Sequence, residues 1–364
     1  MKRKISIPAA LMSAIMLLSA CTANTVPAAT ENTSPSGSSA AVTSETTTET
    51  TTETTTAETQ PELKFVDHEF NPHVLSEIYL MAYGKDFEDD FYRFCDAVLA
   101  GEDKVALDKP EYYYDCVSVA RTCLPITSEY IYWQDINDIS NGDGTYRIEY
   151  PVPHDEYMEE VARFKGRVEE LIEKCIHEGD TDLEKIIELY TSESARLSYD
   201  YAAADDTGAE APVRACNPYH SLMEDSGICQ EIAGTYAYLL LQLGIDAVNC
   251  GALNDDASES HEWTVVKIGD KHYHCDVTFQ LDTSNSLRYF GMTDSQRHAE
   301  GSWSIDGFNF GDSNEVWHKD IPCDDTRFEE LWMCDYYEID NDNNTISCYT
   351  LANANNPYLV FSLD

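Results

Sequence analysis

The sequence is short of positive charge. Its 364 residues hold 23 lysines and arginines against 67 aspartates and glutamates, a formal net charge of −44 at pH 7. Binding to a phosphate backbone needs a basic surface, so the composition excludes nucleic acid as a natural partner. It also argues against peripheral binding to anionic lipid. We interpret the charge as that of a solvated extracellular surface; a preference for cationic substrates or for Ca²⁺ is the alternative.

Long apolar runs are also lacking, except at the N-terminus. Ile5 to Leu18 is apolar but shorter than the about 20 residues that span a membrane. It follows the basic Lys2-Arg3-Lys4, as in an export signal. Its end, Leu18-Ser19-Ala20-Cys21, resembles the lipobox of bacterial lipoproteins. The resemblance implies cleavage of residues 1–20 and a lipid on Cys21, hence anchoring at the outer face of a bacterial cytoplasmic membrane. A plain signal peptide or an uncleaved anchor is the alternative.

Residues 21–61 have few large apolar side chains. The repeat Thr-Thr-Thr-Glu recurs between Glu45 and Glu58. Such a segment buries too little surface to fold, so we predict a disordered tether. A flexible chain of this length spans roughly 35 Å on average.

No dense cysteine framework is visible, although the chain has twelve cysteines. An exported protein permits disulfides, but the sequence does not reveal their connectivity. Buried thiols and bridges both remain open for ten of them: Cys95, Cys116, Cys123, Cys175, Cys216, Cys250, Cys275, Cys323, Cys334 and Cys348. The acidic run 340–344 does not fit the EF-hand spacing and reads as a hairpin turn.

The most informative stretch runs from Ser226 to Thr278. Cys229 comes directly before apolar residues at helical spacing, so it should stand at a helix N-terminus. The apolar face comprises Ile232, Ala233, Tyr236, Leu239, Leu240 and Leu243. Gly227 allows a tight turn before this helix, and Gly244 is a suitable stop after it. Unpaired N–H groups and the helix dipole favour a thiolate at such a position.

A β-hairpin follows the predicted helix. Residues 262–268 and 271–278 are β-rich and are joined by Gly269-Asp270, a two-residue turn signal. With that turn at the centre, Trp263 faces Asp276 and His261 faces Thr278. His261 and Asp276 are then diagonal neighbours on one face, roughly 7 Å apart at Cβ. That separation suits a hydrogen bond from an imidazole to a carboxylate. Cys229, His261 and Asp276 would thus form a nucleophile, a base and an orienting group.

This pattern resembles the transglutaminase-like superfamily, a branch of the papain-like fold. The matching residues are Cys229-Gln230, His261-Glu262-Trp263 and Asp276-Val277-Thr278, together with Leu243-Gly244-Ile245 at the helix end and Tyr289-Phe290 in a later strand. The resemblance implies an α+β fold in which a helix bearing the cysteine packs on an antiparallel sheet. It also implies a Cys-His-Asp catalytic triad. Glu231 and Glu262 depart from the family's usual Gly and Ala, which bears on substrate preference.

The same residues allow other interpretations. A cysteine in an apolar setting is often an inert buried thiol, but the spacing of His261 and Asp276 favours a catalytic one. The cluster His272, His274, Cys275 and Asp276 suggests a metal site, but alternation along a strand points Cys275 to the face opposite His274 and Asp276. We therefore predict no metal and no cofactor.

Three further residues are candidates for the substrate cleft: Gln230, Trp263 and Tyr219. Trp263 is most simply a cleft wall or a core aromatic. Tyr219 or Asn217 is a candidate oxyanion donor beside the N–H of Cys229. Glu231 and Glu262, if they line the cleft, would attract an ammonium group.

The rest of the chain frames this motif. Residues 62–150 are predicted as a mainly helical accessory region, with Phe87, Phe91, Phe94 and Val98 on one helix face. Residues 151–364 are the predicted catalytic domain. It should begin with helices over 155–177 and from a capping box at Thr181-Asp182-Leu183-Glu184. Strands near 287–290, 345–351 and 358–363 should extend the antiparallel sheet.

Three functions fit the sequence. We rank hydrolysis of peptide or amide bonds by the thiol first. Protein crosslinking by acyl transfer to amines comes second, because no apolar amine tunnel is visible in the sequence. A non-catalytic peptide-binding domain comes third, since a cleft that only binds has no need of three catalytic groups. The expected partner is a peptide or protein at the cell surface or in the cell wall.

Overall fold

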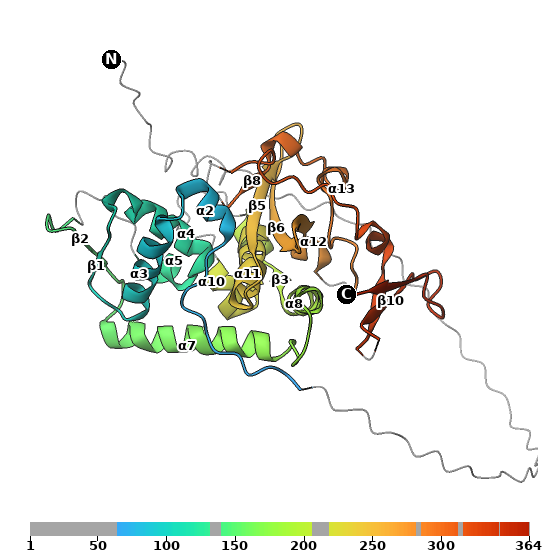
Figure 1. Ribbon diagram of the computed structural model, residues 1–364, viewed down its shortest axis with the longest axis horizontal. Helices are drawn as coiled ribbons and strands as arrows, with labels where there is room; N and C mark the ends of the chain where they lie inside the picture. Colours follow the sequence, from blue (N-terminus) through green and yellow to red (C-terminus); the bar gives the residue numbers. More distant parts are fainter. Residues whose placement is uncertain are drawn as a thin grey trace, which may run out of the picture.

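The structure is a computed structural model that describes residues 64–131, 140–205, 218–281, 285–311, 316–341 and 343–363 (Figure 1). The predicted signal peptide, the lipidation site Cys21, the tether and Asn217 lie outside the described residues. The fold mixes helices with antiparallel sheets and one short parallel pair, β3 (Ser198–Tyr199) with β4 (Ser226–Gly227). Within these ranges, no helix is both long enough and apolar enough to cross a membrane.

The N-terminal region is mainly helical, as the sequence predicted. Its elements are α2 (Glu77–Tyr83), α3 (Phe87–Leu99), α4 (Tyr113–Cys123) and α5 (Ile126–Tyr130), with a small antiparallel pair, β1 (Lys104–Ala106) and β2 (Thr145–Arg147). The predicted face of α3 is buried: Phe87, Phe91, Phe94 and Val98 are all 0% exposed. Such a stripe forms because residues three and four apart lie on one side of a helix.

Two longer helices follow. The first is α7 (His154–Glu173), which runs along the lower edge of Figure 1. The second is α8 (Asp182–Arg196), opened by the predicted capping box. The Thr181 hydroxyl accepts from Glu184 N, and the Glu184 carboxylate accepts from Thr181 N. Two donors that a helix start leaves unpaired are thereby satisfied.

The centre of the molecule is a helix packed on a sheet. After α9 (Tyr201–Asp205), α10 (Pro218–Glu224) and β4 (Ser226–Gly227), the helix α11 spans Cys229–Gln242. It packs on β5 (Ala247–Leu253) and β6 (Ser260–Ile268) of a sheet with strand order β7-β6-β5-β8. The other two strands are β7 (Lys271–Cys275) and β8 (Asn309–Phe310). The β6–β7 ladder keeps the predicted register, from Ile268↔Lys271 to Thr264↔Cys275.

The second hairpin strand is shorter than predicted. β7 ends at Cys275, and Asp276 is the N-cap of a short helix, α12 (Val277–Gln280). The Asp276 carboxylate accepts from Phe279 N, so Thr278 is helical and does not lie opposite His261 in a strand. An Asp followed by a short apolar run is compatible with a helix N-cap as well as with a strand. Here Asp276 forms the N-cap.

The C-terminal strands do not extend the central sheet, which corrects the prediction. β9 (Tyr336–Asp340), β10 (Thr345–Tyr349) and β11 (Leu359–Ser362) form a separate antiparallel sheet, labelled by β10 at the right of Figure 1. Residues 287–290 form turns and no strand. Backbone bonds from His274 to Met292 and from Asp276 to Tyr289 already cover the outer edge of β7. These bonds occupy backbone groups on the edge to which another strand would pair.

The N-terminal region and the predicted catalytic domain share a core. Buried apolar residues from Phe70 to Leu363 form one hydrophobic cluster. Asn71 N donates to the Gln242 side chain of α11, and the Ser76 hydroxyl donates to Asp246. The helices of residues 62–150 therefore pack directly on the element that carries Cys229, and the boundary at residue 150 stays an interpretation.

Candidate active site

Cys229 is the first residue of α11, as its spacing predicted. It is 7% exposed, and the first-turn N–H groups of α11 and its dipole act on this position. The helix ends before Gly244, which has a left-handed φ of 77°, the expected helix stop. Gly227 serves a different purpose from the predicted one: a Cβ there would meet the Glu231 carboxylate at 2.9 Å, so only glycine permits this close approach.

Glu231 does not line a cleft, which corrects the expectation that it would attract an ammonium group. Its side chain is 0% exposed, and Oε2 accepts from Ile228 N at 2.9 Å. This bond satisfies a backbone donor just before the helix. Glu231 therefore stabilises the turn that presents Cys229.

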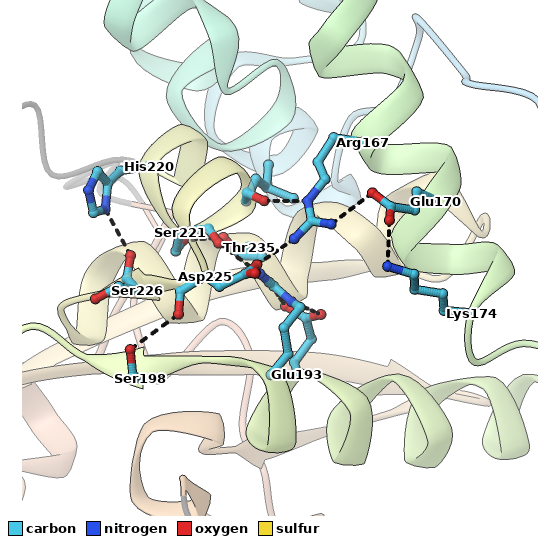
Figure 2. A network of polar contacts seen from close by, with 12 residues as sticks. Arg167, Glu170, Lys174, Glu193, Ser198, His220, Ser221, Asp225, Ser226 and Thr235 are labelled. Carbon is cyan, nitrogen blue, oxygen red and sulfur yellow. Dashed lines mark hydrogen bonds and ion pairs between the residues drawn. The ribbon is translucent and has the colours of Figure 1, made fainter.

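An ionic cluster fixes the segment leading to Cys229 (Figure 2). The Asp225 carboxylate accepts from Arg167 of α7 and from Arg196 of α8. The same two guanidinium groups donate to the carbonyls of Leu222 and Ser221, at the end of α10. Two helices distant in sequence thus hold the turn that precedes the cysteine. Below, "the Asp225 clamp" means Asp225, Arg167 and Arg196.

His261 and Asp276 lie together as the hairpin arithmetic predicted. Nε2 of His261 is 2.8 Å from Oδ2 of Asp276. The two residues are 4% and 0% exposed. Burial alone would raise the pKa of Asp276, but His261 and Arg297 outweigh it, and the pKa is lowered. Asp276 is therefore ionised and orients the imidazole through Nε2–H, which assigns Nδ1 to the acceptor role.

The His261 ring is packed among aromatic rings. It stacks on Phe279 at 4.7 Å between centroids and lies 5.2 Å from Trp303 and 5.8 Å from Trp263. On the same strand, the Thr264 hydroxyl of β6 donates to the Ala233 carbonyl of α11 at 2.8 Å. The strand that carries His261 is thus bonded to the first turns of the helix that carries Cys229.

Trp263 is a buried anchor with a defined partner. It is 1% exposed, and its Nε1–H donates to Nδ1 of His274 at 2.8 Å. His274 Nε2 in turn lies 2.9 Å from Oδ1 of Asp294. An Nδ1 that accepts from Trp263 requires the proton on Nε2, which is then donated to Asp294.

This proton position bears on metal binding. Within the described ranges, one group that could hold a metal is His274, Asp294 and Cys323. A metal on His274 Nε2 would leave the neutral ring's proton on Nδ1, where it would face the Trp263 donor. The hydrogen bonds of the site therefore do not fit a metal.

The second such group is His177, Asp180 and Glu188. Burial and the neighbouring Asp180 raise the pKa of Glu188 to about 9. The 3.4 Å contact between His177 and Glu188 has the geometry of an ion pair, but a protonated Glu188 makes it a neutral hydrogen bond. The neutral form of Glu188 is favoured, because Asp180 and Glu188 lie side by side, and two such carboxylates bind one proton more readily than both ionise.

The remaining residues proposed for the substrate cleft are Tyr219, Gln230 and Glu262. The Tyr219 hydroxyl donates its one proton to Glu160 of α7, at 2.9 Å, so it is not an oxyanion donor as considered from the sequence. Gln230 is half-buried, directly after Cys229. Glu262 is half-buried and accepts from the Asn249 amide at 3.1 Å.

No disulfide joins the ten cysteines that the structure describes.

Arg297 is the residue that sequence reasoning missed. It lies on α13 (Asp294–Ala299), is 0% exposed, and donates from Nη1 to Oδ2 of Asp276 at 2.8 Å. An N-cap at Thr293 signals this short helix, but one arginine in six residues gives no periodicity that would reveal its burial.

Comparisons with known proteins add little. No family model matches the sequence, and no curated protein matches it. One solved structure with partial similarity is a "Putative Cysteine Protease from Cytophaga hutchinsonii", with a TM-score of 0.22 and 15% identity over 27% of this chain and 32% of that one. Another is named as a TGase, with a TM-score of 0.28 and 14% identity over 46% of this chain and 38% of that one. The chain thus matches well under half the length of either protein.

Proposed function

We propose that this protein is a transglutaminase-like thiol enzyme that hydrolyses peptide or amide bonds through Cys229, His261 and Asp276. The observation that carries the proposal is the buried His261–Asp276 hydrogen bond on a strand packed against the helix that begins at Cys229. A binding cleft has no use for a buried His–Asp pair whose histidine lies on a strand packed against a helix that begins at a cysteine.

The reaction begins when Nδ1 of His261 accepts the Cys229 proton. The thiolate attacks the substrate carbonyl, and N–H groups at the start of α11 stabilise the oxyanion. The imidazolium then donates its proton to the leaving amine, which departs as the thioester forms. Water, activated by His261, attacks the thioester; the acid leaves and Cys229 is restored. Asp276 holds the ring through both half-reactions.

The acceptor in the second half-reaction distinguishes hydrolysis from crosslinking. The full chain would be incubated with a peptide library in the presence of a primary amine, and the products separated by mass. Free acids that disappear in Cys229→Ala are the expected result. Amine adducts without free acid would show a crosslinking enzyme. Turnover by Cys229→Ala at the wild-type rate would remove Cys229 as nucleophile. Asp276→Asn, which disturbs the tautomer of His261, should leave a small residual rate.

We further propose that the protein is a lipoprotein on the outer face of a bacterial cytoplasmic membrane, anchored through Cys21. The support is the lipobox-like Leu18-Ser19-Ala20-Cys21 and the polar segment after it. The substrate would then be a peptide or protein at the cell surface or in the cell wall. Cys21→Ala should release the protein from membranes or leave its precursor uncleaved. Normal processing with unchanged membrane retention would contradict the anchor.

A further inference from the structure

Arg297 is a cation deep in the site that the reaction scheme above does not use. Its guanidinium group lies 4.7 Å from the Trp263 ring, 4.8 Å from the Phe279 ring and 5.8 Å from the Trp303 ring. These are also the three aromatic residues that surround His261. A buried charge is costly unless it is paired, and Asp276 is the carboxylate that pairs with it.

The pairing occurs on a particular atom. Oδ2 of Asp276 receives both Nη1 of Arg297 and Nε2 of His261, each at 2.8 Å. Oδ1 receives Phe279 N at 3.0 Å. The carboxylate is therefore held by three donors from α12, α13 and β6, and it cannot rotate without breaking a bond to each of them. This arrangement requires an ionised Asp276.

Arg297 also changes how Asp276 acts on His261. A lone buried carboxylate strongly favours a protonated imidazole beside it. Here the carboxylate already neutralises the Arg297 cation, so an imidazolium at His261 would be a second positive charge beside a nearly neutral pair. The two donor nitrogens share one oxygen, so they lie no more than about 5.6 Å apart, twice the 2.8 Å of each bond.

We propose that Arg297 is a positioning residue of the thiol reaction: it fixes Oδ2 of Asp276 on Nε2–H of His261 and disfavours protonation of His261. The inference rests on the proposed function, in which His261 must be neutral before it accepts the Cys229 proton. A unit charge at about 5 Å, with an effective dielectric constant of about 20, changes a neighbour's pKa by about two units. Loss of Arg297 should therefore raise the pKa of His261.

The other side chains around Arg297 are consistent with this assignment. The Thr293 hydroxyl caps the first turn of α13, and Asp294 on the same helix holds His274 and through it Trp263. Glu300 is the other carboxylate that acts on Arg297, but its side chain bonds to Gln296. One short helix thus positions both Asp276 and the tryptophan beside His261. Burial lowers the pKa of Arg297, and the Asp276 carboxylate acts most strongly against that shift.

The test is an NMR titration of His261 in the full chain carrying Cys229→Ala, which removes the thiol from the titration. Arg297→Met should raise the pKa of His261 by about one to two units, and Arg297→Lys, which keeps the charge, by much less. A shift below about 0.3 units in Arg297→Met, with the fold intact, overturns the proposal. A role in packing alone predicts lower stability in both variants with no difference in the His261 titration.

Arg297→Met leaves Asp276 buried without its cation, which favours misfolding. A second pair of variants avoids an uncompensated buried carboxylate. Asp276→Asn removes the anion, and Asp276→Asn with Arg297→Met removes both charges. The double variant should show a His261 pKa at least one unit above that of the single variant. Equal values contradict the proposal. The titration does not need turnover, so an inactive protein that shows the shift refutes only the proposed function.

Discussion

The Asp225 clamp makes a prediction about stability that depends on both charge and backbone. Asp225 has a left-handed φ of 55°, and its half-exposed carboxylate binds Arg167 and Arg196, which are 16% and 13% exposed. Each ion pair is worth about 1 kcal/mol, the upper end for pairs in contact with solvent. A left-handed backbone costs alanine about 1 kcal/mol more than it costs aspartate or glycine. Asp225→Ala should therefore destabilise the protein by about 3 kcal/mol.

Two matched variants separate these contributions. Asp225→Gly loses both ion pairs but tolerates the backbone, so it should cost about 2 kcal/mol. Asp225→Asn keeps an acceptor oxygen and tolerates the backbone, so it should cost about 1 kcal/mol. Urea unfolding followed by circular dichroism measures all three. The reasoning is refuted if Asp225→Ala lies within about 0.5 kcal/mol of the wild type, or if glycine is worse than alanine.

Two further predictions concern Glu188 and the glycines. The pKa of Glu188 in the folded state is raised from 4.5 to about 9, so the stability it contributes is complete below pH 4.5 and is lost as pH rises toward 9. Glu188→Gln should melt like the wild type near pH 4 and be more stable by at least about 1 kcal/mol near pH 8.5; equal melting at both would contradict the shift. Gly234→Ala should destabilise by about 1–3 kcal/mol, because a Cβ would meet Pro218 Cγ at 2.4 Å. Its control, Gly166→Ala, meets no atom within 4 Å on α7 and should stabilise by about 0.5–1 kcal/mol; the reverse order in thermal melting would exclude steric crowding as the cause.

Local rules predicted the central elements well. The apolar spacing after Cys229 predicted α11, and the Gly269-Asp270 turn predicted the register that brings His261 to Asp276. Both depend on interactions between residues close in sequence, which spacing and turn chemistry describe.

Features that depend on distant residues could not be predicted. Arg297 reaches Asp276 from 21 residues away, and Arg167 reaches Asp225 from 58. Whether β9–β11 joined the central sheet depended on which segment bonded to the outer edge of β7. The segment that contains Tyr289 and Met292 does so. Glu231 was expected near the cleft because it belongs to the motif around Cys229; a backbone donor at Ile228 explains its burial.

The central claim is that Cys229 is an activated nucleophile. Burial raises the pKa of several other described thiols, among them Cys95, Cys123 and Cys275. The contact with Cys348 instead lowers the pKa of Cys334, but this residue is 0% exposed.

The most direct test is the rate of iodoacetamide labelling at each cysteine of the native full chain, resolved by peptide mass at neutral pH. The account predicts that Cys229 reacts at least about ten times faster than any other cysteine and that His261→Ala slows it toward the rest. Labelling of Cys229 no faster than that of the other cysteines, or unchanged in His261→Ala, would contradict it.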